Sequence, residues 1–178
     1  ISSLEQIFHR LDKAGLTLKA KKCNLFKREL KYLGFIISGQ GIKCDPEKLD
    51  TLDRWDRPKN INDVRAFMGF VNYHRRFLPK LAHFSAPLVE LTKKNVSFVW
   101  TAKQEESFNT IKQMMTNCGA LAHPVSVGEF ILDTDASAFG IGGALSQVQN
   151  GIEIPIAFAS QSLSTTERNY CTTKRELL

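Results

Sequence analysis

Apolar residues recur every three or four positions in several segments of the chain, which is the spacing of one face of a helix. Residues 2–14 form the first such segment, and Gly15 follows them as a helix-ending residue. The apolar positions of this segment are Leu4, Ile7, Phe8 and Leu11. This spacing predicts an amphipathic helix over residues 2–14.

The same spacing returns in the middle of the chain, in three segments separated by turns that contain Pro or Asn. Asp45 followed by Pro46 is typical of a helix start, because Asp caps free amide groups and Pro suits the first helical position. A second helix is predicted to begin near Asn60 and to be stopped or kinked by Pro79, and a third to cover residues 86–92. These three short helices predict a small helical subdomain.

Two other parts of the chain have the shorter apolar runs that are typical of β-strands. Residues 16–26 and 29–38 are predicted to form a β-hairpin, which a turn at Gly39–Gly41 follows. Farther along, three strands are predicted in the segments EFILDT, GIGGALSQ and EIPIAFAS. The turns between them are short, which favours antiparallel pairing.

A helix with the capping-box pair Thr101 and Gln104 precedes these three strands, and the segment VSFVW before it reads as an extended connector. Another helix is predicted to begin at Ser164 and to run to the last residue. The whole pattern predicts an α+β fold: a β-hairpin, a small helical subdomain, then a sheet with one helix. Since three strands and one helix make a thin module, we expect this fold to continue in a longer protein.

The composition is that of a globular protein, with 43% hydrophobic and 24% charged residues. No run of about 18 apolar residues is present, so no membrane span is expected. The four cysteines are far apart in the sequence and form no C-x-x-C motif, which argues against structural zinc and favours reduced thiols in an intracellular protein. They are Cys23, Cys44, Cys118 and Cys171.

The net charge of +6 is unevenly distributed along the chain. Residues 1–95 hold 19 Lys and Arg against 10 Asp and Glu, whereas residues 96–178 hold 5 against 8. A basic first part beside a mildly acidic second part is expected of a module that grips a polyanion next to one that carries carboxylates. Charge alone is equally compatible with a solvated, lysine-rich surface.

Two carboxylates, Asp133 and Asp135, interrupt an apolar strand. Burying a carboxylate is costly unless it is paired, hydrogen-bonded or bound to a metal, so this strand must either be exposed or have a cation against it. Side chains alternate along a strand, which puts both aspartates on one face with Cα atoms about 6.7 Å apart. In the last predicted helix Glu176 shares a face with Thr172 and Thr173, and this face can turn towards the strand.

Carboxylates that a strand and a helix bring together suit Mg²⁺, a hard cation that prefers oxygen ligands. Two such ions roughly 3.5–4 Å apart stabilise the attacking and leaving oxygens in phosphodiester cleavage. The alternative is structural: Asp133 is exposed, Asp135 hydrogen-bonds the backbone of the following turn, and Glu176 is a surface residue.

The segments TDASAFGIGGALSQ and PIAFASQSLSTTERNYCTTKRELL closely resemble the start of the ribonuclease H domain of gypsy-type, long-terminal-repeat retrotransposon Pol polyproteins. Upstream, GLTLKAKKCNLFKRELKYLGFIISGQGIKCDPEKLDTLDRW, VRAFMGFVNYHRRFLPKLAHFSAPLVELTKK and FVWTAKQEESFNTIK resemble the reverse transcriptase of the same family. The resemblance covers essentially the whole chain and keeps the family's order.

The resemblance implies four regions. Residues 1–44 correspond to the end of the reverse transcriptase palm with a primer-grip-like hairpin, and residues 45–95 to the helical thumb. Residues 96–127 correspond to the connection, and residues 128–178 to the N-terminal, truncated part of a ribonuclease H-like α/β domain. The polymerase aspartates of the family's Y-x-D-D motif are expected upstream of Ile1.

By the same resemblance, Asp135 and Glu176 are the catalytic residues, as ligands of Mg²⁺ in a two-metal site. Asp133 falls where the family varies, so it is interpreted as a bystander. The two further carboxylates of the family's site are expected beyond residue 178. The 178-residue chain alone is therefore expected to have no polymerase activity and little or no nuclease activity.

Five residues are candidates for nucleic acid binding: Tyr32, Leu33, Gly34, Arg75 and Arg76. The first three resemble the primer grip, where a Gly lets the backbone approach nucleic acid closely. The alternative for Gly34 is a simple strand bend. The two arginines stand at a helix end, where they can take phosphates or can merely complement the helix dipole.

The family's activities are RNA-directed DNA synthesis and metal-dependent cleavage of the RNA in RNA–DNA hybrids. The expected partners are such a hybrid or a template–primer duplex, together with the remainder of the Pol polyprotein. A cytoplasmic particle or the nucleus is the expected location. The alternative hypothesis is a host-retained, catalytically inactive module that binds nucleic acid through its basic first part, with an affinity that falls steeply as salt rises.

Overall fold

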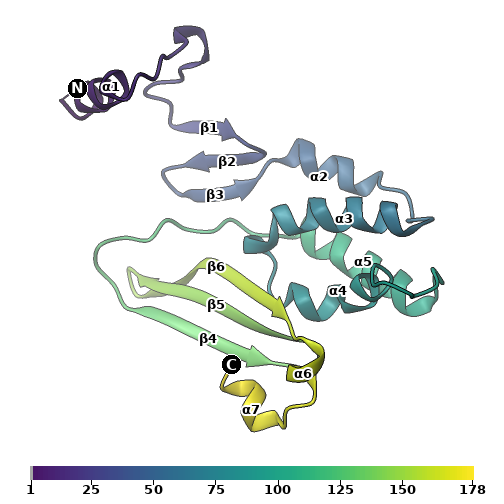
Figure 1. The fold of residues 1–178 in the computed structure, drawn as a ribbon. Coiled ribbons are helices and arrows are strands. Elements are labelled where there is room, and N and C mark those ends of the chain that lie inside the picture. Colours follow the sequence, from purple (N-terminus) through teal and green to yellow (C-terminus); the bar gives the residue numbers. More distant parts are fainter. Residues whose placement is uncertain (1) are drawn as a thin grey trace.

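The computed structural model describes residues 2–178, which form two three-stranded sheets with a group of helices beside them (Figure 1). The first helix, α1 (Ser2–Lys13), confirms the predicted amphipathic helix. It lies apart from the rest of the chain in Figure 1, and none of its residues is buried. On its apolar face Ile7 and Phe8 are exposed, and Leu4 and Leu11 are half-buried.

The strand predicted over residues 16–26 is wrong. This segment holds only a short 3₁₀ turn, η1 (Ala20–Lys22), and all its side chains are exposed. Strand-like residues without a neighbouring strand bury too little surface to hold the extended form, so apolar pattern alone misled the prediction.

The hairpin is formed instead within the segment predicted as one strand over residues 29–38. Strands β1 (Glu29–Tyr32) and β2 (Phe35–Ser38) pair antiparallel, and β3 (Gly41–Cys44) pairs with β2. Leu33 and Gly34 make the two-residue turn between β1 and β2, with φ angles of 49° and 79°. Positive φ at both central residues is typical of a type I′ hairpin turn, so Gly34 is a turn residue rather than a bend within a strand.

The predicted helical subdomain is present, and its capping residues are where the sequence predicts them. Asp45 caps α2 (Pro46–Asp53), Asn60 caps α3 (Ile61–Tyr73), and a 3₁₀ turn, η2 (Arg75–Phe77), follows α3. Helix α5 (Ala102–Thr116) begins with the predicted capping box of Thr101 and Gln104.

One helix start is wrong: α4 (Leu81–Glu90) begins five residues before the predicted Ala86 and contains Pro87. The residue before it, Lys80, has a left-handed backbone and makes no side-chain cap, so the sequence carries no recognisable start signal there.

Helices α2 to α5 enclose one apolar core, which we call the helical core. Its centre contains Phe67, which is fully buried, with its ring 4.7 Å from that of Phe108. The buried residues of the helical core are Leu52, Val64, Phe67, Met68, Val71, Leu78, Leu81, Leu88, Leu91, Phe108, Ile111 and Met115. None of the helices formed by residues 2–178 has the length and apolar character that a membrane span requires.

The three strands predicted after Pro124 are confirmed as an antiparallel sheet. Strands β4 (Phe130–Ala136), β5 (Gly140–Gln149) and β6 (Ile152–Ser162) lie in the order β4-β5-β6, so β4 is at an edge. A register shift interrupts the β5–β6 pairing between Leu145 and Ser146. We call these three strands the C-terminal sheet.

The single helix predicted from Ser164 to the last residue is wrong. Ser164 forms the predicted capping box, but α6 (Thr165–Arg168) ends after one turn, and α7 (Thr172–Glu176) starts again after Cys171. The intervening residues include Asn, Tyr and Cys, which have low helix propensity. The break lets α7 fold back beside β4, as Figure 1 shows.

The segment after α5 joins the two sheets. Leu121 forms an isolated bridge with Ile42 of β3 through two backbone hydrogen bonds of 2.8 Å each. The next amide, that of Ala122, donates to the carbonyl of Pro155 in β6 at 2.9 Å. Leu121 and Ala122 therefore link the sheet of β1, β2 and β3, which we call the hairpin sheet, to the C-terminal sheet.

Candidate metal and nucleic acid site

Asp135 lies near the end of β4, opposite Gly142 of β5, and its side chain is 57% exposed. The Nζ atom of Lys80, just before α4, is 2.7 Å from its Oδ2 atom. The strand is thus exposed and also has a cation against it. The hydrogen bond and charge of Lys80 hold the pKa of Asp135 below its ordinary value, so the carboxylate stays ionised.

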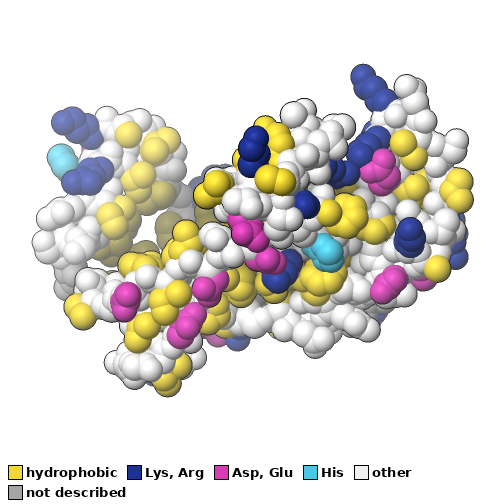
Figure 2. Space-filling model, turned by 90° about the horizontal axis from the view of Figure 1, so that it is seen from below, with side chains coloured by type: hydrophobic (Ala, Val, Ile, Leu, Met, Phe, Trp, Pro, Cys, Tyr) yellow, Lys and Arg dark blue, Asp and Glu magenta, His cyan; other side chains and the backbone are white. Residues whose placement is uncertain are grey.

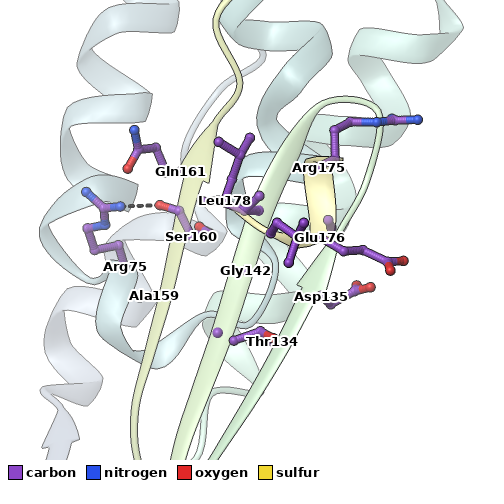
Figure 3. Close-up of a pocket in the computed structure, with 14 residues that line it drawn as sticks. Arg75, Thr134, Asp135, Gly142, Ala159, Ser160, Gln161, Arg175, Glu176 and Leu178 are labelled. Carbon is purple, nitrogen blue, oxygen red and sulfur yellow. Dashed lines mark hydrogen bonds between the residues drawn. The ribbon is translucent and has the colours of Figure 1, made fainter. Parts of the chain in front are cut away.

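Glu176 is the last residue of α7 and lines the same cavity as Asp135, which has a volume of about 640 Å³. In Figure 3 both carboxylates point to the same side, from neighbouring elements. The cavity is also lined by Arg75, Ser160, Gln161 and Arg175. The break between α6 and α7 produces this placement, because it lets α7 turn back towards β4.

Asp133 stands two residues before Asp135 on β4, opposite Ala144, and its side chain is exposed. It is not among the residues that line the cavity of Asp135 and Glu176. The face seen in Figure 2 carries several Asp and Glu side chains beside Lys, Arg and His side chains, with apolar side chains between them.

The donor set at this place consists of carboxylate oxygens. Within residues 2–178, no three His, Cys, Asp or Glu side chains are grouped closely enough to hold a metal ion by themselves. Mg²⁺ does not require such a cage, because it keeps several waters and commonly binds through one or two carboxylates together with substrate phosphates. Asp135 and Glu176 therefore fit the oxygen chemistry and small ligand number of Mg²⁺.

The three hairpin candidates lie at the tip of the β1–β2 turn. Tyr32 and Leu33 are exposed, by 55% and 66%. The hydroxyl of Tyr73, at the end of α3, donates a hydrogen bond to the carbonyl of Leu33, and the Tyr73 ring stacks on Phe35 with centroids 5.2 Å apart. The turn is therefore presented to solvent while α3 holds it in place.

The two arginine candidates lie on the 3₁₀ turn η2 and make different contacts. Arg75 donates a hydrogen bond to the carbonyl of Ser160 in β6, the dashed line in Figure 3. Arg76 lies against the ring of Phe77, with its guanidinium carbon 5.9 Å from the ring centroid. The structure brings Arg75, but not Arg76, to the lining of the Asp135 cavity.

Sequence reasoning missed Lys80, the cation that faces Asp135. No local signal marks it, since it is one of 24 Lys and Arg residues and is 55 positions from its partner. Gly142, opposite Asp135 on β5, gives no clue either. A Cβ atom at this position would stand 3.8 Å from Cγ of Lys80, which is an ordinary van der Waals contact, so the site does not require glycine.

Residues 100–178 match the family described as the RNase H-like domain found in reverse transcriptase. Such domains are generally metal-dependent. The chain is 34% identical over 177 residues to the retrovirus-related Pol polyprotein from transposon 412 of Drosophila melanogaster, covering 99% of this chain. It is 31% identical over 179 residues to the transposon Tf2-3 polyprotein of Schizosaccharomyces pombe.

The chain spans 14% and 13% of the length of these two polyproteins. Among solved structures, the foamy viral protease–reverse transcriptase in complex with an RNA/DNA hybrid matches with a TM-score of 0.76 and 25% identity, over 99% of this chain and 24% of that one. A form of the same viral protein with double-stranded DNA matches with a TM-score of 0.73. The chain is therefore homologous to the reverse transcriptase and RNase H region of retrotransposon Pol polyproteins, as the gypsy-type resemblance implies, with the RNase H-like match over its residues 100–178.

Proposed function

We propose that this chain is the part of a retrotransposon Pol polyprotein that joins the grip on a nucleic acid duplex to the RNase H site. Residues 1–44 are the end of the palm, residues 45–95 the thumb, residues 96–127 the connection and residues 128–178 the first part of the RNase H domain. The whole polyprotein carries out RNA-directed DNA synthesis and Mg²⁺-dependent cleavage of RNA in RNA–DNA hybrids, inside the cell.

The observation that carries the proposal is the placement of Asp135 and Glu176. They are 41 positions apart in the sequence and come from β4 and α7, yet they line one cavity. Arg75, which donates a hydrogen bond to the carbonyl of Ser160, lines the same cavity. The solved foamy viral relative that binds an RNA/DNA hybrid has the same fold over almost the whole of this chain, which supports a hybrid or template–primer duplex as the partner.

In this proposal Asp135 and Glu176 would hold Mg²⁺, and two such ions in the complete site would stabilise the charge on the attacking and leaving oxygens of the scissile phosphate. Lys80 forms an ion pair with Asp135 and lowers the pKa of its carboxyl group, which is ionised at neutral pH in any case because its ordinary value is 3.8. The exposed tip formed by Tyr32, Leu33 and Gly34 approaches the duplex. Arg76 adds positive charge beside the backbone phosphates, without reading base sequence.

Binding of Mn²⁺, as a paramagnetic substitute for Mg²⁺, to the 178-residue chain tests the metal assignment. Asp135→Asn and Glu176→Gln are expected to weaken Mn²⁺ binding, followed by the NMR line broadening of nearby residues, by at least several-fold. Asp133→Asn is the matched control and is expected to leave the affinity unchanged. Equal losses in all three variants would mean that surface charge, rather than a defined site, attracts the ion.

The 178-residue chain alone is expected to cleave an RNA–DNA hybrid little or not at all in Mg²⁺ or Mn²⁺. Its described residues bring only two carboxylates to the cavity, and no third acidic, His or Cys side chain completes a cluster there. Clear turnover that Asp135→Asn abolishes would contradict this expectation.

The alternative is a module that binds nucleic acid without catalysis, and the net charge of +9 on residues 1–95 is what favours it. Fluorescence anisotropy with a labelled hybrid is expected to show affinity that falls steeply between 50 and 200 mM salt, as estimated for several phosphate contacts. Arg76→Gln is expected to weaken binding, whereas the control Lys103→Gln, on the exposed start of α5, is expected to have little effect. Hybrid binding without any Mn²⁺ site would favour this alternative. An affinity for the hybrid that does not change with salt concentration would contradict both the proposed function and the alternative.

A further inference from the structure

Two of the four cysteines lie side by side where the hairpin sheet meets the helices. Cys44 ends β3 and is buried, and Cys118, just after α5, is half-buried. Their Sγ atoms are 3.4 Å apart and the two thiols are hydrogen-bonded, although the residues are 74 positions apart. Neither residue takes part in the proposed metal or nucleic acid site.

The backbone holds the two cysteines in place. The Ile42–Leu121 bridge, with its two hydrogen bonds, lies two residues before Cys44 and three residues after Cys118. Phe77 and Leu121 pack with Cys44 in a small buried cluster. Because a disulfide bond is about 2.05 Å long, the two sulfur atoms need to approach by about 1.4 Å, which small side-chain rotations provide.

The pair also divides the chemical roles between its members. The Sγ atoms of Cys44 and Cys118 share a hydrogen bond, which lowers the pKa of Cys118 and, together with burial, raises the pKa of Cys44. A thiolate, not a thiol, is the nucleophile in thiol oxidation. Cys118, the more accessible of the two, is thus the attacking residue and Cys44 the resolving residue.

We propose that Cys44 and Cys118 form an oxidative modification site, which closes to a disulfide when the chain meets a peroxide. The Cys118 thiolate attacks one peroxide oxygen, the O–O bond breaks, and hydroxide leaves, so Cys118 becomes a sulfenic acid. The Cys44 sulfur then attacks the Cys118 sulfur, and the S–O bond breaks as the departing hydroxide takes the Cys44 proton to form water. The first hydroxide takes up the proton that Cys118 had released, so two thiols lose two electrons and one peroxide becomes two waters.

The disulfide would tie the hairpin sheet to the end of α5. A link between residues 74 positions apart restricts the unfolded chain strongly. The oxidised chain is therefore expected to unfold at a temperature roughly 10 °C higher than the reduced chain. The disulfide would also fix the position of the hairpin relative to the helical core.

The test treats the reduced 178-residue chain with a small excess of hydrogen peroxide and maps the cysteine peptides without reduction. The expected product has one Cys44–Cys118 cross-link, with Cys23 and Cys171 still reduced, and a raised unfolding temperature that dithiothreitol reverses. Two results would overturn the proposal. One is Cys118 halted as sulfenic or sulfinic acid with Cys44 reduced, and the other is a disulfide formed by the exposed Cys23 or Cys171 in place of this pair.

Variants separate this pair from general thiol oxidation. Cys118→Ser and Cys44→Ser are each expected to abolish the peroxide-induced rise in unfolding temperature. Cys23→Ser and Cys171→Ser are the matched controls and should keep it. Peptide mapping of the unmodified sequence decides the question even if a buried variant folds poorly, since it requires no substitution.

Discussion

The helical core and the C-terminal sheet differ in where they keep their large side chains. Leu52, Phe67 and Ile111 of the helical core are completely buried, whereas Phe130 and Leu132 of β4 are 51% and 66% exposed. The candidate ligands Asp135 and Glu176 belong to the exposed region. The helices thus bury an apolar core of their own. The C-terminal sheet carries the candidate ligands at its surface and is stabilised by contacts with the helices.

The support is visible in a few contacts. The backbone amide of Ala82 in α4 donates to Oγ of Ser160 in β6 at 3.2 Å, and Arg75 donates to the carbonyl of the same serine. Lys80 reaches Asp135 from the same side. Substitutions in the two regions should therefore differ in how much they lower the free energy of unfolding and in which part of the chain they destabilise.

The largest expected effect is that of Phe67→Ala in the helical core. Removing a fully buried ring that packs on Trp55 and Phe108 is expected to lower the free energy of unfolding by about 3–5 kcal/mol. Leu132→Ala on exposed β4 is the matched control and should lower it by less than about 1 kcal/mol. Urea unfolding followed by circular dichroism measures both, and equal effects would refute the contrast between the regions.

Gly140→Ala tests the contact between the two regions. A Cβ atom there would stand 2.7 Å from the carbonyl oxygen of Gln161 and 2.9 Å from Cβ of Ala82, so backbone must shift. The expected loss is about 1–3 kcal/mol, with faster hydrogen exchange in β5 and β6. Gly69→Ala, inside α3 with open space around it, is the control and should stabilise the chain by about 0.5–1 kcal/mol.

Thr101→Ala should act on the helical side alone. Thr101 accepts a hydrogen bond from the amide of Lys103 and belongs to the capping box of α5, so its loss is expected to destabilise the chain by about 1 kcal/mol. Hydrogen exchange should rise in the first turn of α5 and stay unchanged in β4. Increased exchange throughout the C-terminal sheet would show that the two regions unfold as one unit.

The smallest expected effect is that of Lys80→Gln, which concerns the charge rather than the packing of Asp135. Lys80 lowers the pKa of Asp135 from its ordinary value of 3.8, so the ion pair stabilises the folded chain above about pH 4 and loses its effect as the pH falls through the lowered pKa. In Lys80→Gln the pKa of Asp135, followed by the NMR shift of its carboxyl carbon, should return towards 3.8. An unchanged pKa would mean that the contact is not formed in solution.

The parts of this fold that the sequence predicts well depend on local signals. The caps at Asp45, Asn60 and Thr101 mark their helices, because side-chain capping involves neighbours two or three residues away. The turns between β4, β5 and β6 are short enough to dictate antiparallel pairing. Residues 16–26 show the limit of such signals, since an apolar pattern becomes a strand only where a partner strand is available.

In the candidate site, too, the sequence predicts what a local motif marks and misses what only the folded chain brings together. The family motif indicates Asp135 and Glu176, and the structure adds that they line one cavity. Their assignment as metal ligands, like that of the five nucleic acid residues, stays a prediction. The Lys80–Asp135 and Cys44–Cys118 pairs could not be predicted, because each joins residues more than fifty positions apart that only the folded chain brings together.

The bridge between Ile42 and Leu121 has a consequence for the order of events during synthesis. A ribosome that adds 5–20 residues per second needs roughly 4–16 s to extend the chain from the first of these residues to the second. During that interval β3 is already synthesised, but Leu121, which later pairs with Ile42, is not. The helical core also requires α5, which supplies Phe108, Ile111 and Met115, so the core and the bridge are both completed at the end of this interval.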